Sequence, residues 1–133
     1  MSDDRLALSP LTNAAAALRR VMDMQPRTDV VRDSIVKRFE FTCELAWRTM
    51  RRALMAHGTS VDELSRRNLY RAAARSGLID DPEAWFRYHE GRNLTSHTYD
   101  EATALRVIAM IDGFGAAVER LLASLATFDV DPA

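Results

Sequence analysis

The chain has 133 residues, a length typical of one domain, and we expect residues 1–133 to form a single helical domain. Hydrophobic residues make up 47% and charged residues 28%, which excludes a disordered or fibrous chain. The formal net charge of -1 excludes strong attraction of the whole molecule to nucleic acid or anionic lipid, so any phosphate site must be local.

Cysteine usage and the first residues predict the compartment. Cys43 is the single cysteine and cannot form an internal disulfide. Residues 1–4 lack the basic and apolar regions of a signal peptide, and no run approaches the roughly 18 apolar residues of a membrane span. We therefore expect a cytoplasmic protein without a membrane partner.

Apolar residues recur at helical spacing along almost the whole chain, and no alternating run predicts a strand. The first predicted helix has Ser9 as its N-cap and Pro10 at its first helical position, and it ends before Pro26. The second runs from about Thr28 to His57, which is long for a domain of this size.

The second predicted helix is apolar on more than one side. Its main stripe runs from Val31 to Leu54 in steps of three and four residues, whereas Phe41, Leu45 and Trp47 lie off that stripe. Such a helix needs cover on more than one side, either within a bundle or from a second chain.

Three further helices complete the prediction. A short helix spans Ser65–Ser76, a longer one begins at Asp81, and the last runs from about Asp100 to Leu125. Residues 127–133 are expected to form a frayed tail. The predicted fold is an all-α, up-and-down bundle of four main helices plus a short helix.

A polar segment, residues 92–101, lies between the last two predicted helices and contains Arg92, His97 and Tyr99. Arginine can hold a phosphate by two parallel hydrogen bonds, and an imidazole that titrates near neutral pH can transfer a proton. Together they suffice for phosphodiester chemistry. The structural alternative is that Arg92 caps carbonyls at a helix end, His97 packs at a bend, and Asp100 caps the last helix.

The spacing of Arg92 and His97 constrains how they meet. Five residues along a continuous α-helix leave the two side chains roughly 140° apart around the axis. They share a site only if the helix breaks around Thr95 and Ser96, or if a second chain related by a two-fold axis completes the site.

The pattern Arg-x4-His-x-Tyr, formed by Arg92, His97 and Tyr99, resembles the signature of HEPN-domain proteins. The block RFEFTCELAW at residues 38–47, combined with residues 92–101, is similar to the nucleotidyltransferase substrate-binding branch of that family. The resemblance covers about residues 9–126, which is nearly the whole chain.

This resemblance implies a helical homodimer that is the toxin of a toxin-antitoxin pair, encoded beside a minimal nucleotidyltransferase as antitoxin. It implies a metal-independent endoribonuclease with Arg92 and His97 as catalytic residues in a cleft at the dimer interface. It also implies that the partner silences the nuclease by attaching AMP to Tyr99. The alternative is a non-catalytic substrate-binding or docking subunit of a nucleotidyltransferase.

Several neighbouring residues are expected to support the site. Asn93 is expected to position the RNA backbone, and Ser96 is a further binding residue beside His97. Glu40 and Glu44 lie one turn apart and either line the cleft or balance nearby arginines.

Two other groups of residues have competing interpretations. His89, Glu90 and His97 match no metal-binding spacing, so we expect no metal and no cofactor. Arg67 and Arg71 belong to a basic stripe that recurs every four residues along the short helix. Such a stripe either follows an RNA backbone or is simply a solvated face, and the solvated face is the commoner case.

Overall fold

The computed structural model describes residues 7–62, 64–97 and 100–128, and within these ranges it contains helices and no strand. The helices are α1 (Ser9–Met22), α2 (Asp29–Ala56), α3 (Arg66–Arg75), α4 (Pro82–His97), α5 (Glu101–Ala109) and α6 (Ile111–Phe128). The predicted all-α, up-and-down bundle is confirmed. In the described ranges, no helix is both long and apolar enough to cross a membrane.

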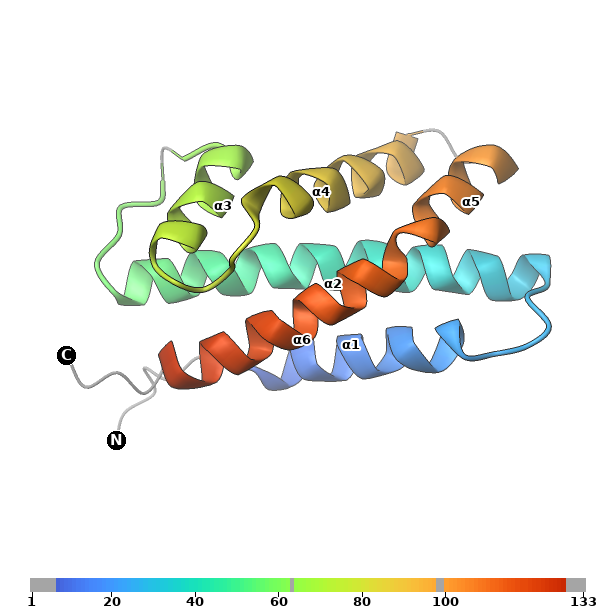
Figure 1. Ribbon diagram of the computed structural model, residues 1–133, viewed down its shortest axis with the longest axis horizontal. Helices are drawn as coiled ribbons and strands as arrows, with labels where there is room; N and C mark the ends of the chain where they lie inside the picture. Colours follow the sequence, from blue (N-terminus) through green and yellow to red (C-terminus); the bar gives the residue numbers. More distant parts are fainter. Residues whose placement is uncertain (1–6, 63, 98–99, 129–133) are drawn as a thin grey trace.

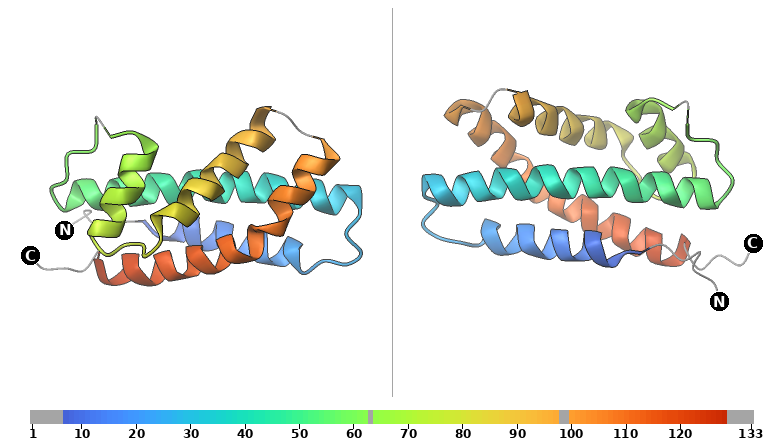
Figure 2. Two further views of the ribbon diagram at one scale, coloured as in Figure 1. Left: turned by 45° about the horizontal axis from the view of Figure 1, so that its top comes forward. Right: turned by 180° about the vertical axis from the view of Figure 1, so that it is seen from behind.

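The long helix α2 lies at the centre of the bundle and packs against each of the other five helices (Figure 1). Helices α1 and α6 cover one side of α2, and α3, α4 and α5 cover the other (Figures 1 and 2). Helices α1 and α4 run antiparallel to α2. This central position explains why the apolar residues of α2 extend beyond a single stripe.

Four helices begin at a side chain that caps their first turn. Each cap accepts a hydrogen bond from a backbone N–H three residues further on, which satisfies a donor that the helix leaves unpaired. The caps are Thr28 of α2, Ser65 of α3, Asp81 of α4 and Asp100 of α5. The expectation that Asp100 caps a helix is therefore confirmed.

The predicted start of α1 is wrong by one residue. The helix begins at Ser9, and Leu8 takes the N-cap position without a side-chain cap. The Leu8 carbonyl already accepts a hydrogen bond from Thr12 N at 2.9 Å, so the helical pattern begins before the serine. Pro10 is tolerated there because the first N–H groups of a helix have no intrahelical acceptor.

The last predicted helix is in fact two helices that meet at Met110. The Met110 methyl group lies against Gly91 of α4, where a Cβ atom would overlap it. The bend lets α5 pack on α2 and α4 while α6 packs on α1 and α2. Because the apolar repeat continues through the bend, helical periodicity alone cannot reveal it.

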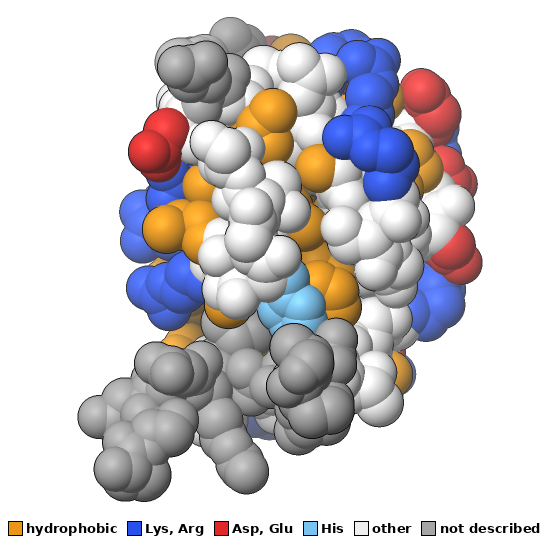
Figure 3. All heavy atoms as spheres, turned by 90° about the vertical axis from the view of Figure 1, so that its left-hand side faces the viewer, with side chains coloured by type: hydrophobic (Ala, Val, Ile, Leu, Met, Phe, Trp, Pro, Cys, Tyr) orange, Lys and Arg blue, Asp and Glu red, His pale blue; other side chains and the backbone are white. Residues whose placement is uncertain are grey.

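The end of the bundle where α2 and α6 finish is more ordered than predicted. Helix α6 continues to Phe128, so residues 127 and 128 are helical, and residues 129–133 of the predicted tail lie outside the described ranges. The Phe128 ring stacks on His57 with ring centroids 3.9 Å apart. Figure 3 shows histidine and hydrophobic side chains together on this end of the molecule.

An aromatic cluster from three helices forms the centre of the core. Phe39 of α2 meets Phe114 of α6 edge to face at a centroid distance of 4.9 Å. Trp85 and Tyr88 of α4 contact the same Phe114 ring at 5.8 and 5.1 Å. Such edge-to-face contacts add to the free energy gained by burying the rings.

The residues off the main stripe of α2 are only partly covered. Leu45 and Trp47 are half-buried, whereas the Phe41 residue remains 57% exposed. The other helices of one chain therefore leave part of the apolar surface of α2 open to solvent.

Replacing Phe39 tests the central packing. We expect Phe39→Ala to lower the free energy of unfolding by about 3–5 kcal/mol, because it leaves a cavity under Phe114. Val30→Ala, at an exposed position of the same helix, should change it by less than about 0.5 kcal/mol. Urea denaturation measures both, and equal losses would contradict this account of the core.

Candidate active site between helices α2, α3 and α4

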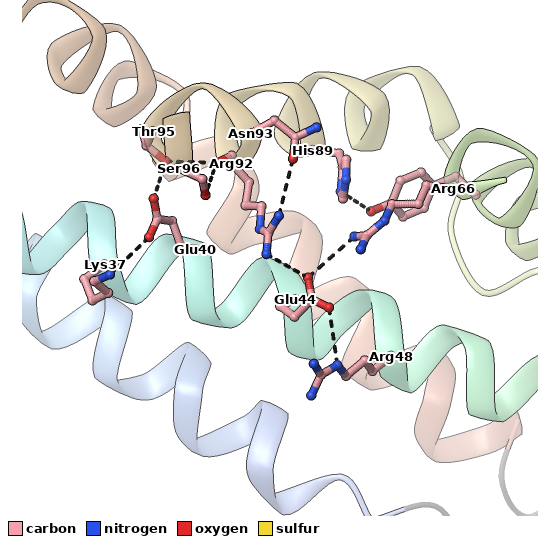
Figure 4. Close-up of polar contacts among 11 residues, drawn as sticks. Lys37, Glu40, Glu44, Arg48, Arg66, His89, Arg92, Asn93, Thr95 and Ser96 are labelled. Atoms are coloured by element: carbon pink, nitrogen blue, oxygen red, sulfur yellow. Dashed lines mark hydrogen bonds and ion pairs between the residues drawn. The ribbon is translucent and has the colours of Figure 1, made fainter. Parts of the chain in front are cut away.

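Three arginine side chains converge on the carboxylate of Glu44 (Figure 4). Arg92 Nη2 and Arg66 Nη1 lie 3.2 and 3.5 Å from Glu44 Oε1, and Arg48 Nε lies 3.3 Å from Glu44 Oε2. We call Arg48, Arg66 and Arg92 the arginine cluster. Its members come from α2, α3 and α4, so the packing of three helices assembles it.

Arg92 points across the bundle toward α2. Its side chain is 29% exposed, and Nη1 donates a hydrogen bond to Asn93 Oδ1 at 3.3 Å. Its Nε is buried and has no hydrogen-bond partner among the described residues. The guanidinium thus lies on Glu44 rather than on carbonyls at the end of α4, and the capping interpretation of Arg92 is wrong.

A second set of contacts joins the end of α4 to α2. Thr95 Oγ1 donates a hydrogen bond to Glu40 Oε2 at 2.5 Å, and Lys37 Nζ lies 3.5 Å from Glu40 Oε1. Ser96 Oγ donates to the Arg92 carbonyl at 3.0 Å. A groove of about 460 Å³ runs beside these contacts, and Asp33, Val36, Lys37, Glu40, Thr95 and Ser96 line it.

Helix α4 is continuous through His97, so the alternative in which it breaks around Thr95 and Ser96 is wrong. Positions 92 and 97 of this helix lie roughly 140° apart around its axis. The His97 side chain lies outside the described part of the structure, and so do residues 98–99, including the predicted modification site Tyr99. The structure thus brings together Arg92, Asn93, Ser96 and Glu40, without placing the other two site residues.

His89 lies one turn before Arg92 on the same face of α4 and was overlooked as a site residue in the sequence. Its Nδ1 is 3.3 Å from the hydroxyl of the buried Tyr70. Burial, together with the positive charges of Arg66 and Arg92, lowers the pKa of His89 to about 4. The imidazole is therefore neutral at pH 7, when Tyr70 can donate to it. The spacing of three residues from Arg92 was the available sequence signal.

Arg66 was also missed, because sequence analysis favoured other arginines of the same helix. Arg67 and Arg71 lie over the Phe86 ring, at 4.5 and 5.4 Å from its centroid. Arg66 instead reaches α2, where its guanidinium also lies 4.3 Å from the centroid of the Trp47 ring. No local pattern distinguishes Arg66 from its neighbours, since its partner Glu44 lies on another helix.

The remaining reactive groups near the site are held in their neutral forms. Burial raises the pKa of the Cys43 thiol to about 12, and it also raises the pKa of Tyr70. Neither group supplies an anionic nucleophile near neutral pH. Among the residues that the structure describes, no three His, Cys, Asp or Glu side chains are grouped to hold a metal ion.

These features define a small helical domain with a cationic site on its central helix, and comparison with known proteins supplies the family. Residues 6–127 match the family described as nucleotidyltransferase substrate binding protein like. The chain belongs to this family, which confirms the resemblance to the nucleotidyltransferase substrate-binding branch of the HEPN-domain proteins.

Individual relatives agree with this assignment. The chain is 35% identical over 130 residues to a Haemophilus influenzae protein named probable ribonuclease HepT, covering 86% of this chain and 88% of the relative. The H. influenzae protein HI0074, described as having the fold of a substrate-binding domain of a nucleotidyltransferase, superposes with a TM-score of 0.81 at 33% identity, covering 90% and 99% of the two chains. A Thermus thermophilus protein superposes with a TM-score of 0.77 at 25% identity, covering 86% and 98%.

The lowered pKa of His89 predicts a pH-dependent stability. Between pH 6.5 and about 4 the unfolded chain binds a proton at His89 that the folded chain excludes, so the protein loses stability as the pH falls through this range. We expect His89→Gln to remove roughly 1–2 kcal/mol of that loss, because partial exposure weakens the effect. Urea denaturation of both proteins at pH 7 and pH 4.5 measures the difference. Identical pH dependence of the two proteins would contradict the neutral, buried state of His89.

Proposed function

We propose that this chain is a metal-independent endoribonuclease that acts as a homodimer in the cytoplasm, as the toxin of a HEPN/nucleotidyltransferase toxin-antitoxin pair. The observation that carries the proposal is the position of Arg92, in an arginine cluster one helical turn from Ser96, which lines a groove between α2 and α4. The 35% identity to a protein named probable ribonuclease supports the same activity.

The proposed reaction uses three residues, Arg92, Asn93 and His97. The ribose 2′-oxygen attacks the adjacent phosphorus and the bond to the 5′-oxygen breaks, which leaves a 2′,3′-cyclic phosphate and a free 5′-hydroxyl. His97 is the general base or the general acid for these proton transfers. Arg92 stabilises the charge on the pentavalent phosphate, and Asn93 positions the RNA backbone.

The geometry of α4 favours a site made by two chains. Because α4 is continuous, positions 92 and 97 lie on different sides of its axis, and a two-fold axis can bring Arg92 of one protomer toward His97 of its partner. Phe41 on α2 and Leu94 on α4 remain 57% and 44% exposed, which leaves apolar surface for such an interface. We propose an isologous interface that includes α2 and residues 92–99.

A second function is favoured by the family description. The family is described as nucleotidyltransferase substrate binding protein like, and the HI0074 fold is described as that of a substrate-binding domain of a nucleotidyltransferase. In that case the same surface is a docking site and has no turnover of its own. A wild-type protein that neither cleaves RNA nor inhibits growth on its own would favour this second function.

Mixing two inactive variants tests the shared site. We expect Arg92→Ala and His97→Ala each to abolish RNA cleavage and growth inhibition, because each removes a group that acts in the transition state. Unfolding and refolding the two variants together should restore about a quarter of the wild-type rate. When equal amounts of the two variants are refolded, half of all dimers are heterodimers, and each heterodimer has one complete site of two.

The products and the particle mass provide the controls for this test. The wild-type product should end in a 2′,3′-cyclic phosphate and should form in the presence of EDTA. Light scattering of each preparation should give twice the chain mass of 15.0 kDa. Full activity of either single variant, dependence on a divalent metal, or a monomeric particle would contradict the proposed mechanism.

The proposed partner is a minimal nucleotidyltransferase encoded beside this chain, and the proposed target of AMP transfer is Tyr99. AMP attached there introduces a bulky anion next to Arg92, which competes with the substrate phosphate. Coexpression with the neighbouring nucleotidyltransferase should therefore increase the intact mass by AMP additions and abolish RNA cleavage.

Tyr99→Phe is the control for this modification, since it removes only the hydroxyl group. We expect this variant to keep its unmodified mass and its nuclease activity during coexpression. Tyr70→Phe removes a buried hydroxyl and should leave the AMP addition unchanged. An adduct that persists in Tyr99→Phe, or a wild-type mass that coexpression does not change, would show that Tyr99 is not the regulatory site.

A further inference from the structure

The charges around Glu44 do not balance. Three guanidinium groups contact one carboxylate, and the Glu44 side chain is only 19% exposed. Among the described residues, Glu44 is the one acid that contacts the arginine cluster, so two positive charges of the cluster exceed its negative charge. A concentration of positive charge that the fold itself only partly neutralises is typical of a site for an anionic ligand.

The arginines are held in place before any ligand arrives. The guanidinium of Arg66 lies over the Trp47 ring, 4.3 Å from its centroid, and this contact limits its conformational freedom. The Nη1 and Nη2 atoms of Arg92 contact Asn93 Oδ1 and Glu44 Oε1, and its Nε is buried. The fold therefore orders the cations of the cluster in advance.

The pKa of His89, which burial lowers most, also responds to the charges of the arginine cluster. Arg66 and Arg92 both disfavour its protonation, and their effect is larger than the opposing effect of Glu44. The carboxylate thus fails to cancel the positive potential that the arginines create. An anion that enters the cluster would meet a favourable field in spite of Glu44.

We infer that Arg48 and Arg66 of the arginine cluster form a subsite for a backbone phosphate of single-stranded RNA, next to the reacting phosphate that Arg92 contacts, and that Glu44 occupies the place of that phosphate in the free protein. This inference rests on the proposed ribonuclease function. Planar guanidinium forks match two phosphate oxygens at once, which favours phosphate as the ligand. Arg66 and Arg48 then bind a group that the reaction itself does not use, and Glu44 becomes an internal competitor.

Binding to a non-cleavable RNA tests the subsite separately from catalysis. The probe is a fluorescein-labelled single-stranded RNA with 2′-O-methyl riboses, which lacks the attacking hydroxyl, and its affinity is measured by fluorescence anisotropy at several salt concentrations. We expect Arg66→Ala to weaken binding about tenfold. It should also reduce the slope of log affinity against log salt by about 0.7, which corresponds to one lost phosphate contact.

Glu44→Gln should have the opposite effect on affinity. Removing the internal anion leaves the arginine cluster free, so we expect RNA binding to tighten about fivefold. A carboxylate that only held the helices together would give no such gain. Arg66→Lys keeps the charge without the planar fork and should restore only part of the affinity.

Arg71→Ala is the matched control. It removes the same charge from the same helix, but Arg71 contacts Asn68 and Phe86 instead of Glu44. We expect its affinity for the probe to stay within about twofold of wild type. Thermal unfolding of each variant checks that the fold is intact.

The outcomes separate this inference from the proposed function. If unmodified RNA is not cleaved but binding still depends on Arg66 and Glu44 as expected, the nuclease proposal fails and the phosphate subsite stands. The subsite is overturned by absence of RNA binding, or by equal losses in Arg66→Ala and Arg71→Ala. It is also overturned if Arg66→Ala lowers the unfolding temperature without changing affinity.

Discussion

The structure depends on a single constraint: a 28-residue helix whose apolar side chains extend beyond one stripe. Those side chains require neighbours on more than one side, and the five other helices pack against α2 while they leave Phe41 exposed. Two carboxylates of α2, Glu40 and Glu44, lie one turn apart on a side of the helix that faces α3 and α4. These half-buried carboxylates need polar partners, and α3 and α4 provide them. The position of the candidate site therefore follows from the way the central helix is covered.

The parts of the fold that depend on neighbouring residues were predictable from the sequence. Capping side chains such as Ser65 and Asp100 act on the turn directly after them, so their type and position indicate where α3 and α5 begin. The bend at Met110 was not predictable, since its observed partner, Gly91, lies on another helix and the apolar repeat runs through the bend unchanged.

The candidate site likewise contains residues that the local sequence indicates and residues that depend on contacts between helices. The segment from Arg92 to His97 was visible in the sequence because it interrupts an apolar pattern with residues suited to phosphate chemistry. The contact of Arg66 with Glu44 joins residues on different helices, and four arginines on or beside α3 offer the same charge. Packing alone selects Arg66, since it is the arginine that faces Trp47 and α2.

The stacking of Arg66 on Trp47 also gives the protein a natural optical reporter. The chain has two tryptophans, and Trp85 is only 2% exposed within the aromatic core. Trp47 is half-buried and has a guanidinium over its ring. The indole emission of Trp47 therefore depends on where that charge lies, while the Trp85 ring contacts Tyr70, Tyr88 and Phe114. Intrinsic fluorescence can then follow the motion of Arg66 without any label, with the emission of Trp85 as the internal reference.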